Sequence, residues 1–448
     1  MRFFFLAAVS VAWAYAVFRD GGVPRADWLW CLLAIAPAAG AYALARARKQ
    51  RPLDLFSRCL LAAFCAVAVL QVLPLPVALI RVLSPARYEL IQAANPVLGK
   101  AGYSTLSAMP NATLDGLATL GACILVLLSM RKLAWQSDEW RWLPVTPIIA
   151  VAGLEALLGL IQCYSEGSDH VARGTYVNRN HYAGLLEMAL PFALMQAIAV
   201  LRRNRDRFRS PAGPALKACG LLLIAALILV AVIHSLSRMG FLVTLAALFV
   251  MGALGLGGWM EGWKRWLPAA AVALGILLCL VFLPIDPLIA RFAELAAGEE
   301  ISSDARAVLW QDTSRLILAY PLAGCGLGAY KSCFLRYKTV APMFSVDFAH
   351  NDYLQVMAEL GIPVMLAGLA LVLRIYWNGV RTVETEEAPD NRYLALACTG
   401  SLTAILLHSL MDFNLYIPAN ALLMAWILGV TSWNIRGAPG PAGPSSTR

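Results

Sequence analysis

Apolar stretches of about 20 residues recur along almost the whole chain, and this feature restricts the fold more than any other. An α-helix that crosses a bilayer needs about 20 mostly apolar residues, because each residue adds only about 1.5 Å of length. Hydrophobic residues make up 60% of the chain and charged residues 14%, and the mean hydropathy is +0.67. A transmembrane β-barrel would show short segments of alternating polarity instead. The sequence therefore predicts an all-α, polytopic integral membrane protein.

The apolar stretches predict about twelve membrane-spanning helices. The first stretch resembles a signal peptide in length, but its basic region consists of Arg2 alone, and its apolar run continues past the small residues that could be cleaved. We therefore interpret it as the first span. The predicted spans are 3–18, 28–45, 59–80, 113–130, 143–163, 182–201, 218–234, 239–259, 267–284, 351–373, 394–410 and 414–433.

The basic residues predict the orientation of these spans, because short loops rich in Lys and Arg stay in the cytoplasm. Most of the 36 Lys and Arg residues fall on one side of the predicted membrane, including those at 46–58, 131–141, 202–217 and 262–266. Both termini are therefore predicted to be cytoplasmic. The loops predicted to face outward include 81–112, 164–181, 235–238 and 285–350. Topology thus explains the net charge of +9, which does not indicate nucleic-acid binding.

The sequence divides into three regions. Residues 1–142 are predicted to be N-terminal transmembrane helices, and residues 143–434 a second helical region that contains the long outer loop 285–350. Residues 435–448 are rich in Gly, Pro and Ser, which predicts a disordered cytoplasmic tail. The ten cysteines show no metal-binding spacing. Cys325 and Cys333 both lie in the long loop, where either a disulfide or two free thiols is compatible with the sequence.

Two arginines stand out among the polar residues at the predicted outer ends of the helices. Arg238 occupies a very short outer turn, where the preference of basic residues for the cytoplasm disfavours it; a snorkelling arginine is the alternative. Arg306 begins a short amphipathic pattern in the long loop, and an ion pair with Asp304 or Asp312 is its alternative role. Two fixed guanidinium groups are suited to holding phosphate oxygens. We therefore predict that both arginines bind a phosphate-containing ligand.

A histidine at the start of a predicted span is the candidate general base. An imidazole with its ordinary pKa of about 6.5 suits proton removal near neutral pH, and His350 is one of five histidines in the chain. The alternative is a histidine that only begins the helix. Asn351 and Asp352 could orient it or cap the helix, and Tyr353 could stack on a sugar ring.

Three other polar features have two possible roles each. Arg173, Asn180 and His181 lie in a polar segment that could bind sugar or phosphate, or could be a turn with an Asn cap for the next helix. His408 and Asp412 are predicted to form a structural hydrogen bond. Glu359, a carboxylate within a predicted span, is expected to pair with another group.

Four segments resemble, in order and spacing, the O-antigen ligase and O-antigen polymerase superfamily. The resemblance extends from about residue 145 to residue 430, and the N-terminal spans match only in hydropathy. The four segments are RGTYVNRNHYAGLLEMALP, SLSRMGFLV, the stretch from Arg306 to PLAGCGLGAY, and HNDYLQVMAELGIP.

The resemblance implies a metal-independent, inverting glycosyltransferase without a cofactor. Members of the superfamily transfer a glycan from undecaprenyl pyrophosphate to a hydroxyl at the periplasmic face of the bacterial inner membrane. By resemblance, Arg238 and Arg306 engage the donor pyrophosphate and His350 is the base. Arg173, Asn180 and His181 fall on a further motif of the superfamily. The acceptor would be lipid A core for a ligase, or a second lipid-linked glycan for a polymerase of O-antigen or exopolysaccharide.

Three alternatives remain open at this point. A related branch of the superfamily glycosylates protein hydroxyls, although no added domain favours it here. A secondary transporter would place ionisable groups at the middle of its spans and show inverted repeats, whereas these polar residues cluster at one face. A non-catalytic assembly partner would not need the two arginines or His350.

Overall fold

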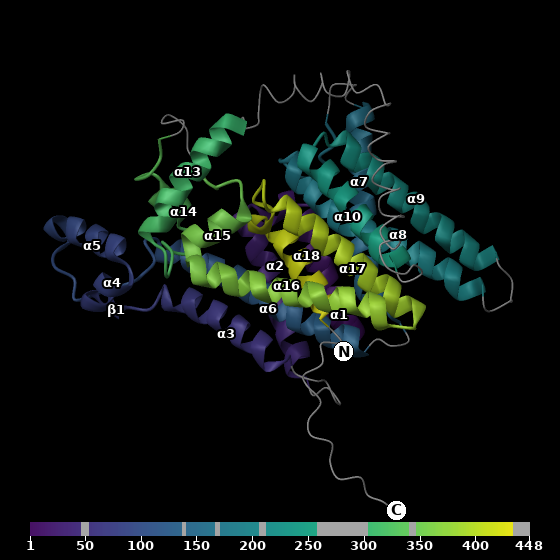
Figure 1. The fold of residues 1–448 in the computed structure, drawn as a ribbon, viewed down its shortest axis with the longest axis horizontal. Helices are drawn as coiled ribbons and strands as arrows, with labels where there is room; N and C mark the ends of the chain where they lie inside the picture. Colours follow the sequence, from purple (N-terminus) through teal and green to yellow (C-terminus); the bar gives the residue numbers. More distant parts are fainter. Residues whose placement is uncertain are drawn as a thin grey trace, which may run out of the picture.

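The computed structural model describes residues 1–45, 53–136, 140–165, 171–205, 212–257, 303–339 and 346–432. This part of the chain is built of helices, with a single antiparallel pairing of two short strands (Figure 1). The N-terminal elements are α1 (Arg2–Val17), η1 (Asp20–Gly22), α2 (Arg25–Leu44), α3 (Leu55–Leu70), β1 (Leu75–Pro76), α4 (Val77–Leu83), α5 (Pro85–Leu98), β2 (Tyr103–Ser104) and α6 (Pro110–Gln136). The remaining elements are η2 (Leu143–Val145), α7 (Thr146–Ser165), α8 (Arg179–Arg205), α9 (Ala212–His234), α10 (Arg238–Gly257), α13 (Ser303–Ala319), α14 (Tyr330–Phe334), α15 (Asp352–Leu360), α16 (Ile362–Thr385), α17 (Pro389–His408), η4 (Asn414–Tyr416) and α18 (Pro418–Thr431).

Seven helices in the described ranges are long and apolar enough to cross a membrane. They are α2, α6, α7 with η2, α8, α9, α10 and α16, and the shorter apolar helices are α1, α3 and α18. The predicted all-α, polytopic membrane class is therefore confirmed, whereas the predicted number of about twelve spans is not. The span predicted at 267–284 and the tail at 435–448 lie outside the described residues.

Helix α8 lies at the centre of the bundle. Within its most apolar window 78% of the residues are buried, against 28% in α9. It packs against α17, α9, α7 and α10, and α18 packs in turn against α6. Buried Trp13 and Trp426 each donate a hydrogen bond to a backbone carbonyl, of Ala419 and Pro144 respectively, so neither indole nitrogen loses a partner on burial.

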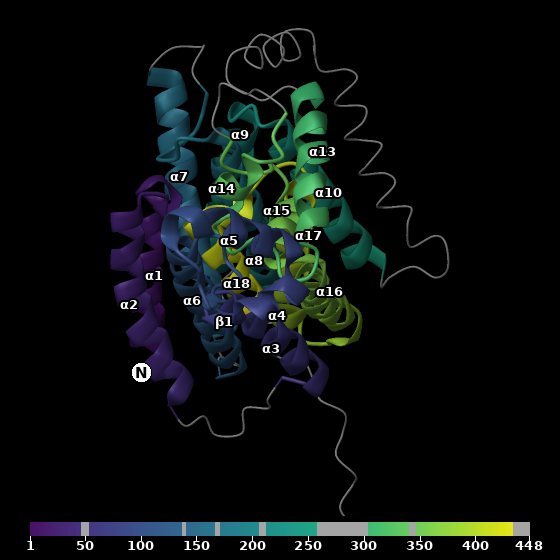
Figure 2. The same ribbon diagram turned by 90° about the vertical axis from the view of Figure 1, so that its left-hand side faces the viewer.

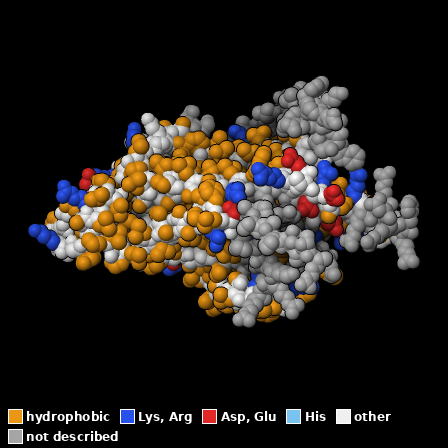
Figure 3. Space-filling view, turned by 60° about the horizontal axis from the view of Figure 1, so that its bottom comes forward, with side chains coloured by type: hydrophobic (Ala, Val, Ile, Leu, Met, Phe, Trp, Pro, Cys, Tyr) orange, Lys and Arg blue, Asp and Glu red, His pale blue; other side chains and the backbone are white. Residues whose placement is uncertain are grey.

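The surface of the bundle is largely apolar. Figure 3 shows hydrophobic side chains covering most of one face, with the charged side chains gathered toward its two ends. Exposed leucines such as Leu33, Leu114 and Leu223 contribute to this surface. An apolar belt of this kind is expected where lipid replaces water as the solvent of a helical bundle.

Segments predicted to be cytoplasmic contact one another, and so do segments predicted to face outward. At one end, Arg131 donates to the carbonyl of Ser432, Trp142 to Asp390, and Arg374 to Asp54. At the other end, the loop after α3 meets the segment 303–350, as in the backbone bond from Ala108 to Cys325. The loop after α7 meets the loops after α9 and α1, as in the bonds from Ala172 to His234 and from Val177 to Asp20. The predicted alternation of the spans therefore agrees with the packing.

The outer end carries a layer of short helices on top of the bundle. Figure 2 shows the molecule from the side that carries this layer, with α4 and α5 nearer the viewer than α14 and α15. The span predicted at 59–80 is wrong in its second half, because α3 ends at Leu70 and the chain turns into β1 and α4. Pro74 and Pro76 explain the break, since proline lacks the N–H that continues a helix.

The span predicted at 351–373 is also wrong as a single helix. The chain forms α15 and α16, and Gly361 between them has φ +89°. A Cβ on Gly361 would lie 2.4 Å from the carbonyl oxygen of Leu322, so glycine permits both the turn and the close packing. The last predicted span, 414–433, is divided as well: it opens with the short helix η4, and the longer helix α18 starts only at Pro418. These breaks leave α15 in the outer layer, where it packs against α13 and α14.

Candidate functional site

His350 has an unusual backbone conformation that its neighbours hold in place. Its φ of +49° lies in the left-handed region, which is uncommon for a residue other than glycine. The preceding residue, Ala349, accepts a hydrogen bond from Trp310 at 3.0 Å and donates one to Gln355 at 2.7 Å. Strain of this kind persists only where the surrounding contacts determine it, so the fold fixes where the imidazole lies.

Asp412 faces this imidazole from the connection between α17 and η4. Its Oδ1 atom lies 3.4 Å from Nδ1 of His350 and 3.8 Å from Nε2 of His181. Phe413 packs edge-to-face with both imidazoles, at ring-centroid distances of 4.9 and 4.6 Å. Burial alone would raise the pKa of Asp412, but the two facing imidazoles lower it well below its usual value. Asp412 is therefore a buried carboxylate that faces two histidines.

The His350 side chain is 22% exposed, whereas those of His181 and Asp412 are 7% and 2% exposed. His350 thus forms the outer part of the group and Asp412 its buried base. Among the residues that the structure describes, Nδ1 of His350, Nε2 of His181 and Oδ2 of Asp412 have no hydrogen-bond partner. Buried polar atoms normally have partners, so this group retains unused capacity for a substrate or water.

Arg306 lies on α13, the helix whose Trp310 contacts the residue before His350. It lies four residues before Trp310, so the two side chains occupy the same face of that helix, one turn apart. The Trp310 indole holds the carbonyl of Ala349, next to His350. The buried Nε atom of Arg306 has no hydrogen-bond partner within the described ranges. Its expected alternative partner Asp312 pairs instead with Arg315, at 2.9 Å, and the side chain of Asp304 lies outside the described residues.

Arg238 begins α10, and its side chain is exposed. Ser237 caps this helix by accepting a hydrogen bond from Gly240 at 3.1 Å. A Cβ on Gly240 would lie 2.6 Å from the Cβ of Ala183, so the first turn of α10 lies directly against the first turn of α8. That turn of α8 carries His181. Arg238, Arg306 and His350 thus lie at the same end of the bundle.

The segment that contains Arg173, Asn180 and His181 runs from a capped turn into the first turn of α8. Asn178 accepts a hydrogen bond from the backbone of Asn180 at 2.8 Å, which agrees with the Asn cap, one of the two alternatives for this segment. Thr175 binds buried Glu155 through its hydroxyl and its backbone N–H, at 2.6 and 3.0 Å. Arg173 is exposed. Of this predicted set, His181 reaches the Asp412 group, whereas the described contacts of the segment anchor it to the bundle.

The three residues after His350 hold the site together. Asn351 caps α15 by accepting from Leu354 at 3.1 Å, as predicted. Asp352 accepts hydrogen bonds from Ser409 at 2.7 Å and from the backbone of Leu415, and burial raises its pKa to about 8. The Tyr353 hydroxyl donates to the carbonyl of Leu406 at 2.7 Å. These polar groups connect α15 to the loop that carries Asp412 and thereby position it.

The predicted side-chain hydrogen bond between His408 and Asp412 is wrong. Nδ1 of His408 lies 2.9 Å from the carboxylate of Glu187, and both side chains are fully buried. Only the backbone N–H of Asp412 bonds to the carbonyl of His408, at 3.2 Å. The reason is a long-range one: α8 and α17 are neighbours in the bundle, and their packing places Glu187 next to His408.

Glu359 organises the glycine-rich turn of the outer layer, so the prediction that it pairs is confirmed. Its carboxylate accepts hydrogen bonds from the backbone of Gly328 and Tyr330, at 2.9 and 3.3 Å, and from the Tyr416 hydroxyl at 2.9 Å. Gln71 donates to the Glu359 carbonyl at 2.6 Å. The turn is thereby tied to both α15 and the end of α3.

We expect the substitution Glu359→Ala to destabilise the protein strongly. It leaves the buried N–H of Tyr330 without an acceptor, at a cost of about 1–3 kcal/mol, and it also removes the acceptor of the Gly328 N–H and of the Tyr416 hydroxyl. The midpoint of thermal unfolding in detergent should fall by several degrees. Glu359→Gln keeps an acceptor oxygen, so its unfolding midpoint should lie between those of the wild type and of Glu359→Ala. An unchanged midpoint in Glu359→Ala would contradict this role.

Cys325 and Cys333 are free, buried thiols in the structure. Both belong to the apolar cluster under α13 and α14. Of the two alternatives that the sequence leaves open, the structure therefore contains the free thiols.

Two parts of this site were not predicted from the sequence. Asp412 was assigned to His408, and Trp310 was not among the predicted site residues. A carboxylate in the short outer connection between two predicted spans, on the same side as His350, was the available signal for Asp412. No local pattern indicates that Trp310 holds Ala349, because that contact spans 39 residues.

The fold and this site define an all-helical membrane protein with a polar, partly hydrogen-bonded group at one end of its bundle. Residues 223–369 match the model of a protein family described as O-antigen ligase. The matched segment contains Arg238, Arg306 and His350, whereas His181 and Asp412 lie outside it. The match confirms the predicted resemblance to the O-antigen ligase and polymerase superfamily, and with the apolar helices it supports a membrane glycosyltransferase of O-antigen ligase type that acts on lipid-linked glycans. No curated protein matches the chain.

Proposed function

We propose that the protein transfers or polymerises a glycan from an undecaprenyl-pyrophosphate donor onto an acceptor hydroxyl, with inversion and without a metal ion. The observation that carries this proposal is the pairing of His350 with buried Asp412 at the end of the bundle where Arg238 and Arg306 also lie. In this proposal the site faces the periplasm, the helices span a bacterial inner membrane, and residues 143–434 form the catalytic region.

His350 acts as the general base in this mechanism. Asp412 favours the tautomer of His350 that carries its proton on Nδ1, because Oδ1 lies 3.4 Å from that atom, and the lone pair of Nε2 is then free for the acceptor hydroxyl. The acceptor oxygen attacks the anomeric carbon as its proton moves to Nε2. His181 faces the same carboxylate oxygen, so it helps to hold Asp412 in place.

The two arginines stabilise the leaving group. As the bond between the anomeric carbon and the diphosphate breaks, negative charge develops on the departing phosphate oxygens. Fixed guanidinium donors can compensate this charge because they are already oriented before the reaction begins. Arg306 has a buried Nε atom available for such a contact, and Arg238 approaches from the start of α10.

The acceptor distinguishes two forms of this activity. A ligase would use lipid A core and a polymerase a second lipid-linked glycan. The test supplies the purified protein with one carrier-linked donor and each acceptor in turn, and the products are separated by mass. Failure of the folded protein to form a product with either acceptor would contradict the proposed transfer.

Asp412→Asn should lower kcat by about 10²–10⁴-fold with little change in KM for the donor. The amide no longer favours the tautomer with its proton on Nδ1, so Nε2 loses its role as base. Asp347→Asn is a matched control, because Asp347 lies in the same outer layer and pairs with exposed Lys331 at 2.9 Å. Equal rates in the two variants would contradict the orienting role of Asp412.

A further inference from the structure

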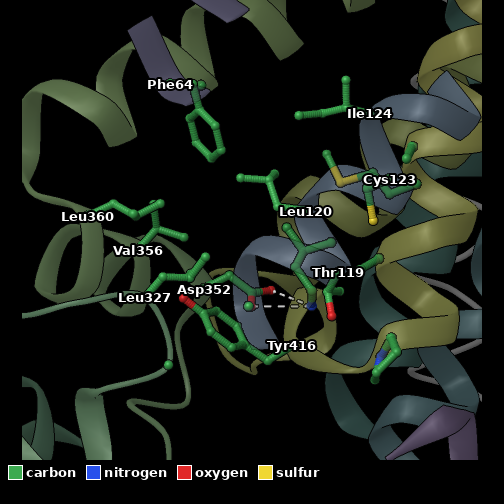
Figure 4. Close-up of a pocket in the computed structure, with 18 of the residues that line it drawn as sticks. Phe64, Thr119, Leu120, Cys123, Ile124, Leu327, Asp352, Val356, Leu360 and Tyr416 are labelled. Atoms are coloured by element: carbon green, nitrogen blue, oxygen red, sulfur yellow. Dashed lines mark hydrogen bonds between the residues drawn. The ribbon is translucent and has the colours of Figure 1, made fainter. Parts of the chain in front are cut away.

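An elongated apolar cavity leads away from the site into the bundle. It has a volume of about 500 Å³ and lies between α2, α3, α6, α15, α16 and α18. Figure 4 shows part of its wall, in which Phe64, Leu120, Ile124, Val356 and Leu360 surround the open space. The part of α6 that lines it runs from Ala112 to Leu127, which corresponds to about 22 Å of helix. The cavity is thus comparable in depth to the hydrocarbon layer of one leaflet or more.

The upper end of this cavity adjoins the candidate site. Asp352 and Tyr353, two and three residues after His350, form part of its wall. Leu415 and Tyr416 line it as well and follow closely after Asp412. Figure 4 shows the bonds from the backbone of Leu415 to the Asp352 carboxylate at this end. A molecule that reacts at His350 could therefore extend from the site into the cavity.

The chemistry of the lining selects an uncharged chain. Arg25 is the one cationic side chain among the lining residues that the structure describes, and it pairs with Asp115 at 2.9 Å. The carboxylate of Asp352 is already used by Ser409 and Leu415. The remaining lining is almost entirely aliphatic and aromatic. Since a phosphate or sugar would lose its hydration here without gaining partners, the cavity fits hydrocarbon.

We propose that this cavity binds the hydrocarbon chain of the lipid-linked substrate whose polar head reacts at His350. The inference rests on the proposed function and adds to it a binding site formed largely by α2, α3 and α6. These N-terminal helices lie outside the segment that matches the O-antigen ligase family. The same chemistry would suit the prenyl chain of the donor carrier or an acyl chain of a lipid acceptor.

The test introduces a tryptophan on α6, inside the cavity in one variant and outside it in another. Leu120 lines the cavity, whereas Leu114 lies on the same helix, does not line it, and is 53% exposed. We compare Leu120→Trp with the matched control Leu114→Trp, and add Ala421→Phe, which lines the cavity from α18, in case the first variant is unstable. Thermal unfolding in detergent verifies that each variant is folded.

Transfer is measured with donors that carry a full-length or a short prenyl chain, and with acceptors that carry or lack their acyl chains. The wild-type protein and Leu114→Trp should prefer one long-chain substrate by about tenfold or more in kcat/KM, since each buried methylene adds to binding. Leu120→Trp should lose that preference and keep its activity with the short-chain form. Loss of the donor preference identifies the prenyl chain as the ligand, and loss of the acceptor preference identifies the acyl chain.

A second readout does not depend on transfer. Native mass spectrometry of the purified protein should find a co-purified lipid in the wild type and in Leu114→Trp, and less of it in Leu120→Trp. Equal lipid retention and equal chain-length preference in all variants would overturn the cavity proposal. Absence of transfer with every substrate would overturn the proposed function, while selective loss of bound lipid in Leu120→Trp would still support a chain-binding cavity.

Discussion

His350→Ala is expected to lower kcat for glycan transfer by about 10²–10⁴-fold, the usual contribution of a positioned general base. The loss should fall on kcat and not on KM for the donor, because His350 acts on the acceptor hydroxyl. His350 is the partly exposed member of the Asp412 group, and its backbone is held by Ala349 and Asn351, whose contacts do not involve the imidazole. The alanine variant should therefore remain folded.

The matched control is His234→Ala. His234 lies at the same end of the bundle, where its Nε2 atom is 3.1 Å from the Tyr164 hydroxyl. Its imidazole thus has a local partner and does not face Asp412. Initial rates measured with carrier-linked donor should be near wild type for His234→Ala. A His350→Ala protein with full activity would remove the proposed mechanism.

Arg306→Ala is expected to lower kcat by about 10²–10³-fold, as for the loss of one fixed donor to developing negative charge. Arg306→Lys should recover only part of the activity, since an ammonium group provides a single point charge in place of the planar guanidinium fork. Arg238→Ala should show a loss of the same kind. The double variant should lose less than the product of the two single losses if both arginines act on one diphosphate.

Arg315 provides the control on the same helix. It lies nine residues from Arg306, which places it on the opposite face of α13, and it pairs with Asp312. Arg315→Ala should keep its rate within a few-fold of wild type, because a partly exposed ion pair contributes little. If Arg315→Ala and Arg306→Ala lose the same activity, the loss reflects the stability of α13 and not binding of a diphosphate.

Local patterns in the sequence were sufficient for the class of fold and for the identity of several site residues. Apolar runs of the length of a membrane span predict helices, because only helices satisfy every backbone group in lipid. A cap was one of the two predicted roles for the segment before α8 and for Asn351, since a cap acts on residues two or three positions away. Arg238 stood out because its position conflicts with the usual distribution of charge.

Breaks within apolar runs could not be predicted in the same way. The break at Gly361 depends on the packing of its backbone against Leu322, and the end of α3 is held by Gln71, which binds the turn 323–327. Both contacts join residues that are far apart in the chain. Hydropathy alone therefore extends the predicted helices past the points where the tertiary structure ends them.

The sequence by itself determined that the chain forms a helical membrane protein, which end of the bundle carries the polar residues, and which arginines and histidine stand out there. The tertiary structure decided that Asp412 faces His350 and His181, that His408 pairs with Glu187, and that an apolar cavity opens beside the site. The physical reason is the range of the interactions. Helix formation and capping depend on neighbours within a few residues, whereas a buried charge finds its partner only when distant helices pack together.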